Sequence, residues 1–239
     1  MKESVLITGS SSGIGQACAH RLARAGMTVI GGARRYIGAN DRIEESPDIT
    51  CLGLDIGDSS SIDAFVDTGI AAKDSQLSYA VLNAGLCLPD GLLAGSVADH
   101  EKVMSGNFSG HLQLLRALDR RDLLRTMKAI VFIGSIYGRR ASPQVISYAA
   151  SKAAVESLTQ SLALELAPAT RVNCVLPGHI DTPMLAAAGP AFVEDVLRRT
   201  PLQRIGTAEE IAQLVEYLLT SATFMTGTAI VADGGYQLT

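Results

Sequence analysis

The stretch TGSSSGIG, residues 8–15, follows the apolar run SVLIT and leads into a segment with helical spacing. Its three glycines have a G-x3-G-x-G spacing: Gly9, Gly13 and Gly15. A glycine-rich turn from a buried strand into a helix lets the backbone approach a pyrophosphate, whose charge then lies at the helix N-terminus. A Ser/Gly-rich surface turn is the alternative. The position between a first strand and a first helix favours a dinucleotide site.

The order of strand and then helix repeats along the chain. Seven apolar runs predict strands, at 4–9, 27–35, 49–58, 79–85, 128–135, 170–178 and 228–235. Helical patterns occupy 10–26, 59–71, 99–120, 147–167 and 207–220, and residues 183–205 form a partly helical excursion. Continuously apolar strands that alternate with helices are typical of a parallel sheet covered on both faces. We therefore expect a Rossmann-like, doubly wound α/β fold of about seven strands, in one domain spanning 1–239.

Composition excludes several classes of protein. The chain has 239 residues, a net charge of −4 and 47% hydrophobic residues, and its basic runs are at most two residues long. These values indicate a globular domain and no nucleic-acid partner. No apolar stretch reaches the roughly 18–20 residues of a membrane span, and the first residues do not resemble a signal peptide. The four dispersed cysteines form no CxxC or Cys/His cluster, so we expect no metal and a cytoplasmic protein with reduced thiols.

A second motif is SYAASKAAVE, residues 147–156, in which Tyr148 and Lys152 lie four residues apart. Side chains at this spacing share one face of a helix. Taken alone, the pair is consistent with an ordinary surface helix. Other motifs of the chain have to decide whether the phenol and the ammonium act together.

Four motifs occur in the order typical of short-chain dehydrogenases/reductases: TGSSSGIG, NAG at 83–85, the Tyr148-x3-Lys152 pair, and PGHIDT at 177–182. The chain resembles the compact single-domain form of this family over essentially its whole length, including the C-terminal stretch 201–235. The resemblance implies an NAD(P)-dependent oxidoreductase that transfers hydride between a nicotinamide and a carbonyl or carbinol carbon.

The resemblance also implies the catalytic residues. Tyr148 is expected to be the general acid/base, and Lys152 is expected to lower its pKa from about 10 towards 7, which takes about 4 kcal/mol. One cation about 4 Å away, at an effective dielectric of about 20, supplies roughly that much, so the lysine, with help from the positive charge of an oxidised nicotinamide, is sufficient. Ser135, which ends a strand 13 residues before Tyr148, is expected to hydrogen-bond the substrate oxygen. Asn107 is implied to hold a water that relays protons to the lysine.

The end of the second strand bears on the choice of nicotinamide. NAD-specific relatives place an aspartate where this chain has Ala33, and Arg34 and Arg35 follow. Guanidinium groups bind a 2′-phosphate, so we expect NADP(H), with NAD(H) as the alternative. The resemblance implies these cofactor contacts: Gly9, Ser11, Ser12, Gly13, Ile14, Gly15, Arg34, Arg35, Asp55, Ile56, Asn83, Ala84, Gly85, Tyr148, Lys152, Pro177, Gly178, Ile180 and Thr182.

The expected activity is NADPH-dependent reduction of a ketone, with residues 183–205 covering a largely apolar substrate pocket. An NAD(P)+-dependent alcohol or sugar dehydrogenase is the first alternative, and a nucleotide-binding regulator without turnover is the second. Arg139 and Arg140 are candidates for recognition of an acidic substrate group, or solvated loop charges. His179 is expected to have no catalytic role. Small residues on the helix after Tyr148 predict a homotetramer or homodimer.

Overall fold

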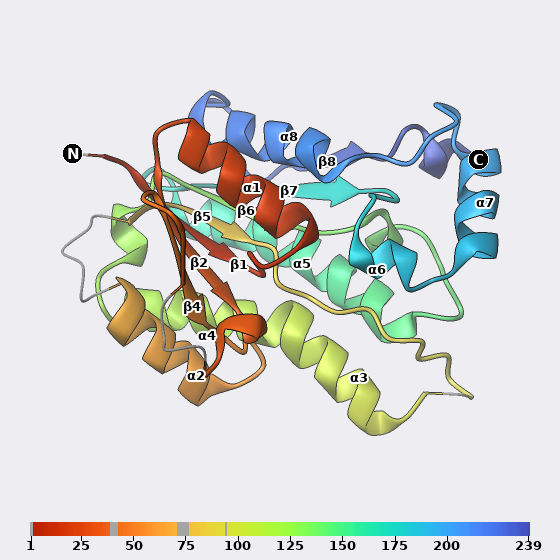
Figure 1. Ribbon diagram of the computed structural model, residues 1–239, viewed down its shortest axis with the longest axis horizontal. Coiled ribbons are helices and arrows are strands. Elements are labelled where there is room, and N and C mark those ends of the chain that lie inside the picture. The colour runs from red at the N-terminus through yellow and green to blue at the C-terminus, as the bar shows by residue number, and fades with distance from the viewer. Residues whose placement is uncertain (1, 39–42, 71–76, 94) are drawn as a thin grey trace.

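A single sheet of eight strands runs through the computed structural model, which describes all residues except 1, 39–42, 71–76 and 94 (Figure 1). The strand order is β3-β4-β2-β1-β5-β6-β7-β8. The strands are β1 (Ser4–Thr8), β2 (Thr28–Ala33), β3 (Ile43–Ser46), β4 (Ile49–Gly53), β5 (Leu77–Leu82), β6 (Ala129–Ile133), β7 (Arg171–Pro177) and β8 (Ala229–Ala232).

Seven of these strands are parallel, as the sequence predicted. The eighth, β3, pairs antiparallel with β4 at the edge of the sheet. It was not predicted, because the four residues IEES are too short and too polar to stand out as a strand. The doubly wound α/β fold is confirmed, with an antiparallel edge strand added to it.

Helices cover both faces of the sheet (Figure 1). Apolar side chains of α1 and α8 pack on one face, and those of α2, α4 and α5 pack on the other. The helices are α1 (Gly13–Arg24), α2 (Ser59–Phe65), α3 (Val97–Met104), α4 (Gly110–Asp119), α5 (Ile146–Leu166), α6 (Pro183–Ala186), α7 (Pro190–Arg199) and α8 (Ala208–Thr220). No helix in the described part of the chain combines the length and hydropathy needed to cross a bilayer.

The expected helix at 99–120 is divided. A π-type turn, Ser105–Ser109, separates α3 from α4. A Cβ on Gly110 would lie 1.9 Å from the Ile56 carbonyl oxygen, so the helix passes too close to the end of β4 for any side chain there. A second π-type turn, Val66–Ile70, continues α2, and the last position expected for that helix, 71, lies outside the described residues.

The site follows from the strand order. After β1 the chain passes to β2 and β4 on one side, and β5, β6, β7 and β8 then extend the sheet on the other side. Ligands of open parallel sheets bind in the crevice at such a reversal, beyond the carboxyl ends of the strands. The glycine loop after β1 and the NAG segment after β5 both lie at this point.

Candidate active site

The glycine loop folds tightly against itself. Gly9 and Gly13 have φ values of +70° and +54°, which favour glycine. A Cβ on Gly15 would lie 2.2 Å from the Gly9 carbonyl oxygen. Ser12 precedes α1 and makes no side-chain hydrogen bond to its first turn, so the first N–H groups of α1 are left for an anion. This backbone cradle fits the diphosphate of a dinucleotide.

The NAG segment holds the glycine loop in place. The Asn83 side-chain amide donates to the carbonyl oxygens of Thr8 (3.0 Å) and Gly9 (3.2 Å). The Thr8 hydroxyl in turn accepts from the backbone N–H groups of Asn83 and Ala84, both at 3.0 Å. Asn83 therefore holds the start of the glycine loop against the end of β5. Its partner Thr8 was not identified as a site residue from the sequence.

A buried histidine supports the same segment. His111 on α4 is 2% exposed, and its Nε2 lies 2.8 Å from the Ala84 carbonyl oxygen. Burial lowers its pKa to about 4, so the imidazole is neutral at pH 7 and Nε2 carries the donated proton. The four histidines showed no convergent spacing in the sequence, so this role became visible only in the fold.

Cations gather at the end of β2. Arg34 and Arg35 begin a short 3-10 turn there, are both exposed, and line the cleft. The Arg35 guanidinium donates to the Ser11 carbonyl oxygen (3.1 Å), which places it at the edge of the glycine loop. Ala33, at the position of the aspartate of NAD-specific relatives, is buried. The arrangement fits a phosphate on the adenosine ribose.

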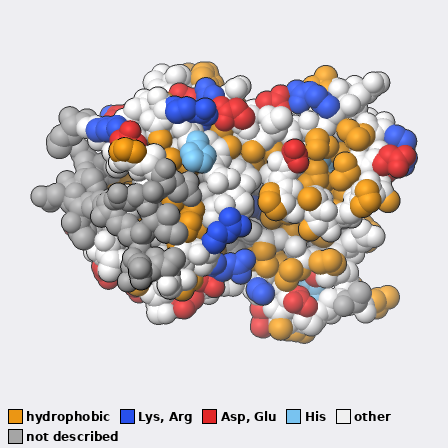
Figure 2. Space-filling view, in the orientation of Figure 1, with side chains coloured by type: hydrophobic (Ala, Val, Ile, Leu, Met, Phe, Trp, Pro, Cys, Tyr) orange, Lys and Arg blue, Asp and Glu red, His pale blue; other side chains and the backbone are white. Residues whose placement is uncertain are grey.

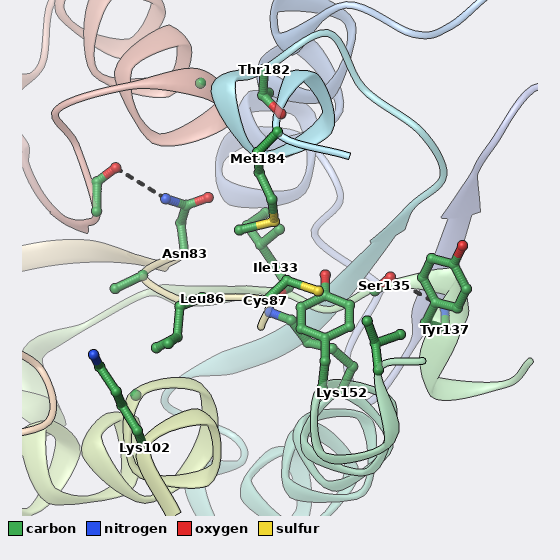
Figure 3. Close-up of a pocket in the computed structure, with 18 of the residues that line it drawn as sticks. Asn83, Leu86, Cys87, Lys102, Ile133, Ser135, Tyr137, Lys152, Thr182 and Met184 are labelled. Carbon is green, nitrogen blue, oxygen red and sulfur yellow. Dashed lines mark hydrogen bonds between the residues drawn. The ribbon is translucent and has the colours of Figure 1, made fainter. Parts of the chain in front are cut away.

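The reacting groups meet beyond the carboxyl end of β6, where Figure 3 labels Ser135 and Lys152. Ser135 follows β6, is 5% exposed, and lies close enough to Tyr148 for its side chain to lower the pKa of the phenol. Lys152, 4% exposed, donates from Nζ to the Ile133 carbonyl oxygen at 2.8 Å. Its Nζ lies 5.6 Å from the centroid of the Tyr148 ring. The three side chains that the sequence predicted to act together are therefore neighbours.

Burial dominates the electrostatics of the pair. It raises the pKa of Tyr148 to about 12, and the Ser135 side chain offsets only part of that rise. Burial also lowers the pKa of Lys152 to about 8. Desolvation therefore holds the phenol pKa above its ordinary value in the chain on its own, and the lowering towards 7 by Lys152 and an oxidised nicotinamide together stays a prediction. At pH 7 the phenol is protonated and the lysine is still mostly charged.

Asn107 lies in the π-type turn between α3 and α4 and is fully buried. Its Oδ1 accepts from the Leu86 N–H (2.8 Å), and its Nδ2 donates to the Leu86 carbonyl (2.9 Å) and the Ser151 hydroxyl (3.0 Å). The side chain therefore connects the loop after β5 to α5, one residue before Lys152. A water relay at Asn107 stays a prediction.

One cleft of about 1760 Å³ extends from the glycine loop to Ser135, Tyr148 and Lys152. Every residue expected to act in catalysis or to contact the cofactor lines it except Gly15, which is buried, and Asn107. Tyr137, His179, Cys87 and Lys102 also line it, and the sequence assigned none of them a catalytic or cofactor-binding role (Figure 3 labels Tyr137, Cys87 and Lys102). Among the described residues, no group of three or more His, Cys, Asp or Glu side chains could hold a metal ion.

Arg139 and Arg140 do not line the cleft. Arg139 forms an ion pair with Glu156, and Arg140 donates to the carbonyl oxygens of Tyr236 (3.1 Å) and Thr239 (3.0 Å). The Arg140 guanidinium also stacks 4.9 Å from the centroid of the Tyr236 ring. The hypothesis that these arginines recognise an acidic substrate group is therefore wrong.

His179 packs among aromatic rings at the substrate end. Its ring centroid lies 4.5 Å from that of Tyr236, 5.5 Å from Phe192 and 5.9 Å from Tyr137. Burial lowers its pKa to about 4, so it adds no charge to this end of the cleft at pH 7. These contacts give His179 a packing role.

Known proteins resemble the whole chain. A family model described as "Enoyl-(Acyl carrier protein) reductase" matches residues 9–237. The uncharacterized oxidoreductase YgfF of Escherichia coli (strain K12) is 36% identical over 96% of this chain and 98% of its own length. The 3-oxoacyl-[acyl-carrier-protein] reductase FabG of Aggregatibacter actinomycetemcomitans is 33% identical over 98% of this chain and 99% of its own length.

Among solved structures, ligand-free aldohexose dehydrogenase from Thermoplasma acidophilum superposes with a TM-score of 0.88 and 28% identity, covering 100% of this chain and 95% of that one. These matches agree with the glycine loop, the NAG segment and the Ser135, Tyr148 and Lys152 neighbours described above. The chain belongs to the short-chain dehydrogenase/reductase family and is an NAD(P)-dependent oxidoreductase.

Proposed function

We propose that the protein reduces a neutral, largely apolar ketone to an alcohol with NADPH. The observation that carries this proposal is the meeting of Ser135, Tyr148 and Lys152 at the end of the cleft, where burial keeps the phenol protonated. A protonated phenol is a proton donor at pH 7, as reduction of a carbonyl requires. Oxidation of an alcohol would need the phenolate as a base.

Three side chains of the protein act around the substrate oxygen, each with a different role. When bound in the cleft, a reduced nicotinamide would provide the hydride for the carbonyl carbon. Tyr148 gives its proton to the oxygen, and the Ser135 hydroxyl donates a hydrogen bond to that oxygen as negative charge develops. Lys152 keeps a positive charge beside the phenol, which favours the phenolate left after proton transfer.

The preference for NADPH rests on charge at the end of β2. Arg34 and Arg35 line the cleft, and Ala33 replaces the carboxylate that would repel a 2′-phosphate. NAD(H) remains the alternative cofactor.

The substrate class rests on the walls of the cleft. Three segments form its substrate end: residues 86–93, 142–146 and 183–192. Among the described residues of these segments, none that lines the cleft is charged, and most are apolar. Such walls suit an apolar ketone better than a polyol, whose hydroxyls need many polar partners.

A second candidate is oxidation of a sugar or another alcohol. It is favoured by the likeness to aldohexose dehydrogenase, with its TM-score of 0.88. Within the three substrate segments only Ser142 and Gln144 line the cleft with side-chain oxygen or nitrogen, and Tyr137 and His179 lie nearby, which is few polar partners for a sugar.

We also propose that residues 1–239 act as one nucleotide-binding domain in which 183–205 cover the substrate, and that the protein is a cytoplasmic homotetramer or homodimer. The sheet that spans the chain supports a single domain. The exposed small residues Ala153, Ser157 and Ser161 on α5 support close approach of a second copy.

The first test compares the two nicotinamides by fluorescence titration at one salt concentration. We expect NADPH to bind at least about tenfold more tightly than NADH, and Arg34→Ala to remove most of that difference. Equal or tighter binding of NADH would instead favour the alcohol dehydrogenase, to be assayed with NAD+.

The second test is Tyr148→Phe, assayed with NADPH and a panel of 2-alkanones and ethyl acetoacetate. Loss of the proton donor should lower kcat about 10²- to 10⁴-fold while the NADPH Kd stays within about twofold. Retention of near-normal turnover by the Phe variant would refute the role given to Tyr148.

A further inference from the structure

Three side chains meet behind the substrate end of the cleft, outside the groups assigned to the reaction. Asp90 lies in the loop after β5, His100 lies on α3, and Ser147 lies in the first turn of α5. The Asp90 Oδ2 accepts from the Ser147 N–H at 2.9 Å, and the His100 Nδ1 lies 3.1 Å from the same oxygen. We call these three residues the Asp90 clasp.

The clasp has the residue types of a hydrolytic triad but not its geometry. In such a triad the histidine uses one ring nitrogen for the serine and the other for the aspartate. Here the His100 Nδ1 faces both partners, at 3.1 Å from Asp90 Oδ2 and 2.5 Å from Ser147 Oγ. His100 therefore cannot pass a proton from the serine towards the carboxylate, and the clasp has no nucleophilic role.

The clasp supplies a side-chain hydrogen-bond acceptor to the first turn of α5. Val145 precedes this helix and offers it no side-chain hydrogen bond. The Asp90 carboxylate, from a distant loop, bonds an N–H of the first turn and places a negative charge at the helix N-terminus, where charge of that sign is stabilising. The N–H that Asp90 bonds belongs to Ser147, and Tyr148 follows Ser147 directly in the chain.

Asp90 also connects two walls of the cleft. Its backbone N–H donates to the Gln144 carbonyl oxygen at 2.9 Å. Cys87, Pro89 and Gly91 line the cleft on one side of this bond, and Gln144, Val145 and Ile146 line it on the other. Asp90 itself is 0% exposed and does not line the cleft, so it acts on the site only through the residues that it holds.

We propose that Asp90, held by His100, is a positioning residue for Tyr148. It orients the first turn of α5, so that the phenol reaches the Ser135 hydroxyl, and it sets the spacing of the two walls. A buried carboxylate is costly unless it is hydrogen-bonded, and here Oδ2 accepts from the Ser147 N–H and lies beside the His100 Nδ1, while Oδ1 has no partner among the described residues. The proposal rests on the proposed function, in which Tyr148 is the proton donor.

The test begins with a readout that needs no turnover. Amide hydrogen exchange is measured over residues 142–150 in the wild type, Asp90→Ala, Asp90→Asn and Thr207→Ala. Asp90→Asn keeps an oxygen acceptor for the Ser147 N–H. Thr207→Ala is the matched control, because Thr207 caps α8 through a capping box and does not line the cleft.

We expect exchange over 142–150 to rise about tenfold or more in Asp90→Ala, to change less than about threefold in Asp90→Asn, and to stay unchanged in Thr207→Ala. Wild-type exchange in Asp90→Ala would overturn the proposal. If Asp90→Ala does not fold, His100→Ala takes its place, because it removes one donor and leaves the carboxylate; unchanged exchange there would also overturn the proposal.

Steady-state kinetics with NADPH and the ketone panel then separate positioning from general stability. Asp90→Ala should lower kcat about tenfold to a hundredfold at a temperature where it is folded, with an unchanged NADPH Kd and with Asp90→Asn recovering most of the loss. A wild-type kcat in Asp90→Ala with raised exchange would overturn the positioning role. Should the wild type reduce none of the ketones, the proposed function fails, and the exchange data alone then decide whether Asp90 holds α5.

Discussion

The glycine loop, residues 8–15, and the substrate rim, which we define as Leu92, Leu93 and Met184, line the same cleft but are constrained in opposite ways. At the loop, backbone fills the space, and a Cβ on Gly15 would lie 2.2 Å from a carbonyl oxygen. At the rim, Leu92, Leu93 and Met184 are 79%, 99% and 47% exposed. Figure 2 shows hydrophobic side chains gathered on the side of this face that carries α6 and α7.

This difference in packing separates residues that the fold and the cofactor constrain from residues that only a substrate would constrain. The loop has one backbone path, so its residues follow from the shape of a diphosphate and of the strands around it. The fold leaves Leu92 and Leu93 mostly exposed and Met184 about half exposed, and exposed apolar groups beside a cleft point to a ligand. We therefore expect substitutions to act on stability and cofactor binding at the loop, and on substrate KM at the rim.

Among the substitutions considered, Gly15→Ala is expected to have the largest effect on stability and on cofactor binding. The added methyl group has no room beside the Gly9 carbonyl, and the loop must shift. We expect the free energy of unfolding to fall by about 4 kcal/mol and NADPH binding to weaken at least about a hundredfold. Urea unfolding and fluorescence titration check both.

The matched control is Gly26→Ala. Gly26 has a φ of +91° but nothing within 4 Å of an added Cβ, so the substitution brings backbone strain alone. The expected loss is about 1 to 2 kcal/mol with unchanged NADPH affinity. Equal losses in the two variants would mean that conformation, and not close approach, governs the glycine loop.

The reaction centre lies between the two regions. Lys152→Met tests how much the buried charge of Lys152 lowers the free energy of unfolding. Because burial lowers the pKa of Lys152 to about 8, the folded chain binds fewer protons than the unfolded chain between pH 8 and about 10.5. The charged lysine therefore destabilises the fold fully below pH 8. We expect Lys152→Met to add about 2 to 3 kcal/mol of stability at pH 7, a gain that fades by pH 10.5, while ketone reduction is lost. Unfolding at pH 7 and at pH 10 measures it, and a destabilised variant at pH 7 would contradict the argument.

His111 supports the cofactor side and makes its stability pH-dependent. The folded pKa of about 4 lies below the ordinary value of about 6.5, so the unfolded chain binds more protons in that window. Stability is therefore complete above pH 6.5 and falls towards pH 4, by about 2 kcal/mol at pH 5 for this group. His111→Gln keeps a donor near the Ala84 carbonyl and should reduce the loss between pH 8 and pH 5 by that amount. An unchanged pH dependence would argue against a neutral buried imidazole.

The smallest effect is expected at the rim. Leu93→Ser removes a side chain that is 99% exposed, so stability should change by less than about 0.5 kcal/mol and the NADPH Kd should not change. The KM for the longer 2-alkanones should rise severalfold. A loss of more than about 1 kcal/mol, with KM unchanged, would assign Leu93 to the fold and reverse the comparison.

Much of the fold and of the site could be predicted from the sequence, because the signals are local. Continuous apolar runs marked the seven parallel strands, and the glycine spacing marked the turn at the switch point. Helix spacing put Tyr148 and Lys152 on one face, the family resemblance added Ser135, and the structure brings the three together. Strand β3 was missed because a short polar edge strand is defined by its partner β4.

Only the tertiary structure could decide properties that depend on distant segments. The pKa of Tyr148 rises because the packed cleft removes water, a quantity that the four-residue spacing to Lys152 does not contain. Asp90, His100 and Ser147 lie 10 and 47 residues apart along the chain and meet at one carboxylate oxygen. Backbone shape is encoded by neighbouring residues, whereas desolvation and long-range hydrogen bonds depend on which segments the fold brings together.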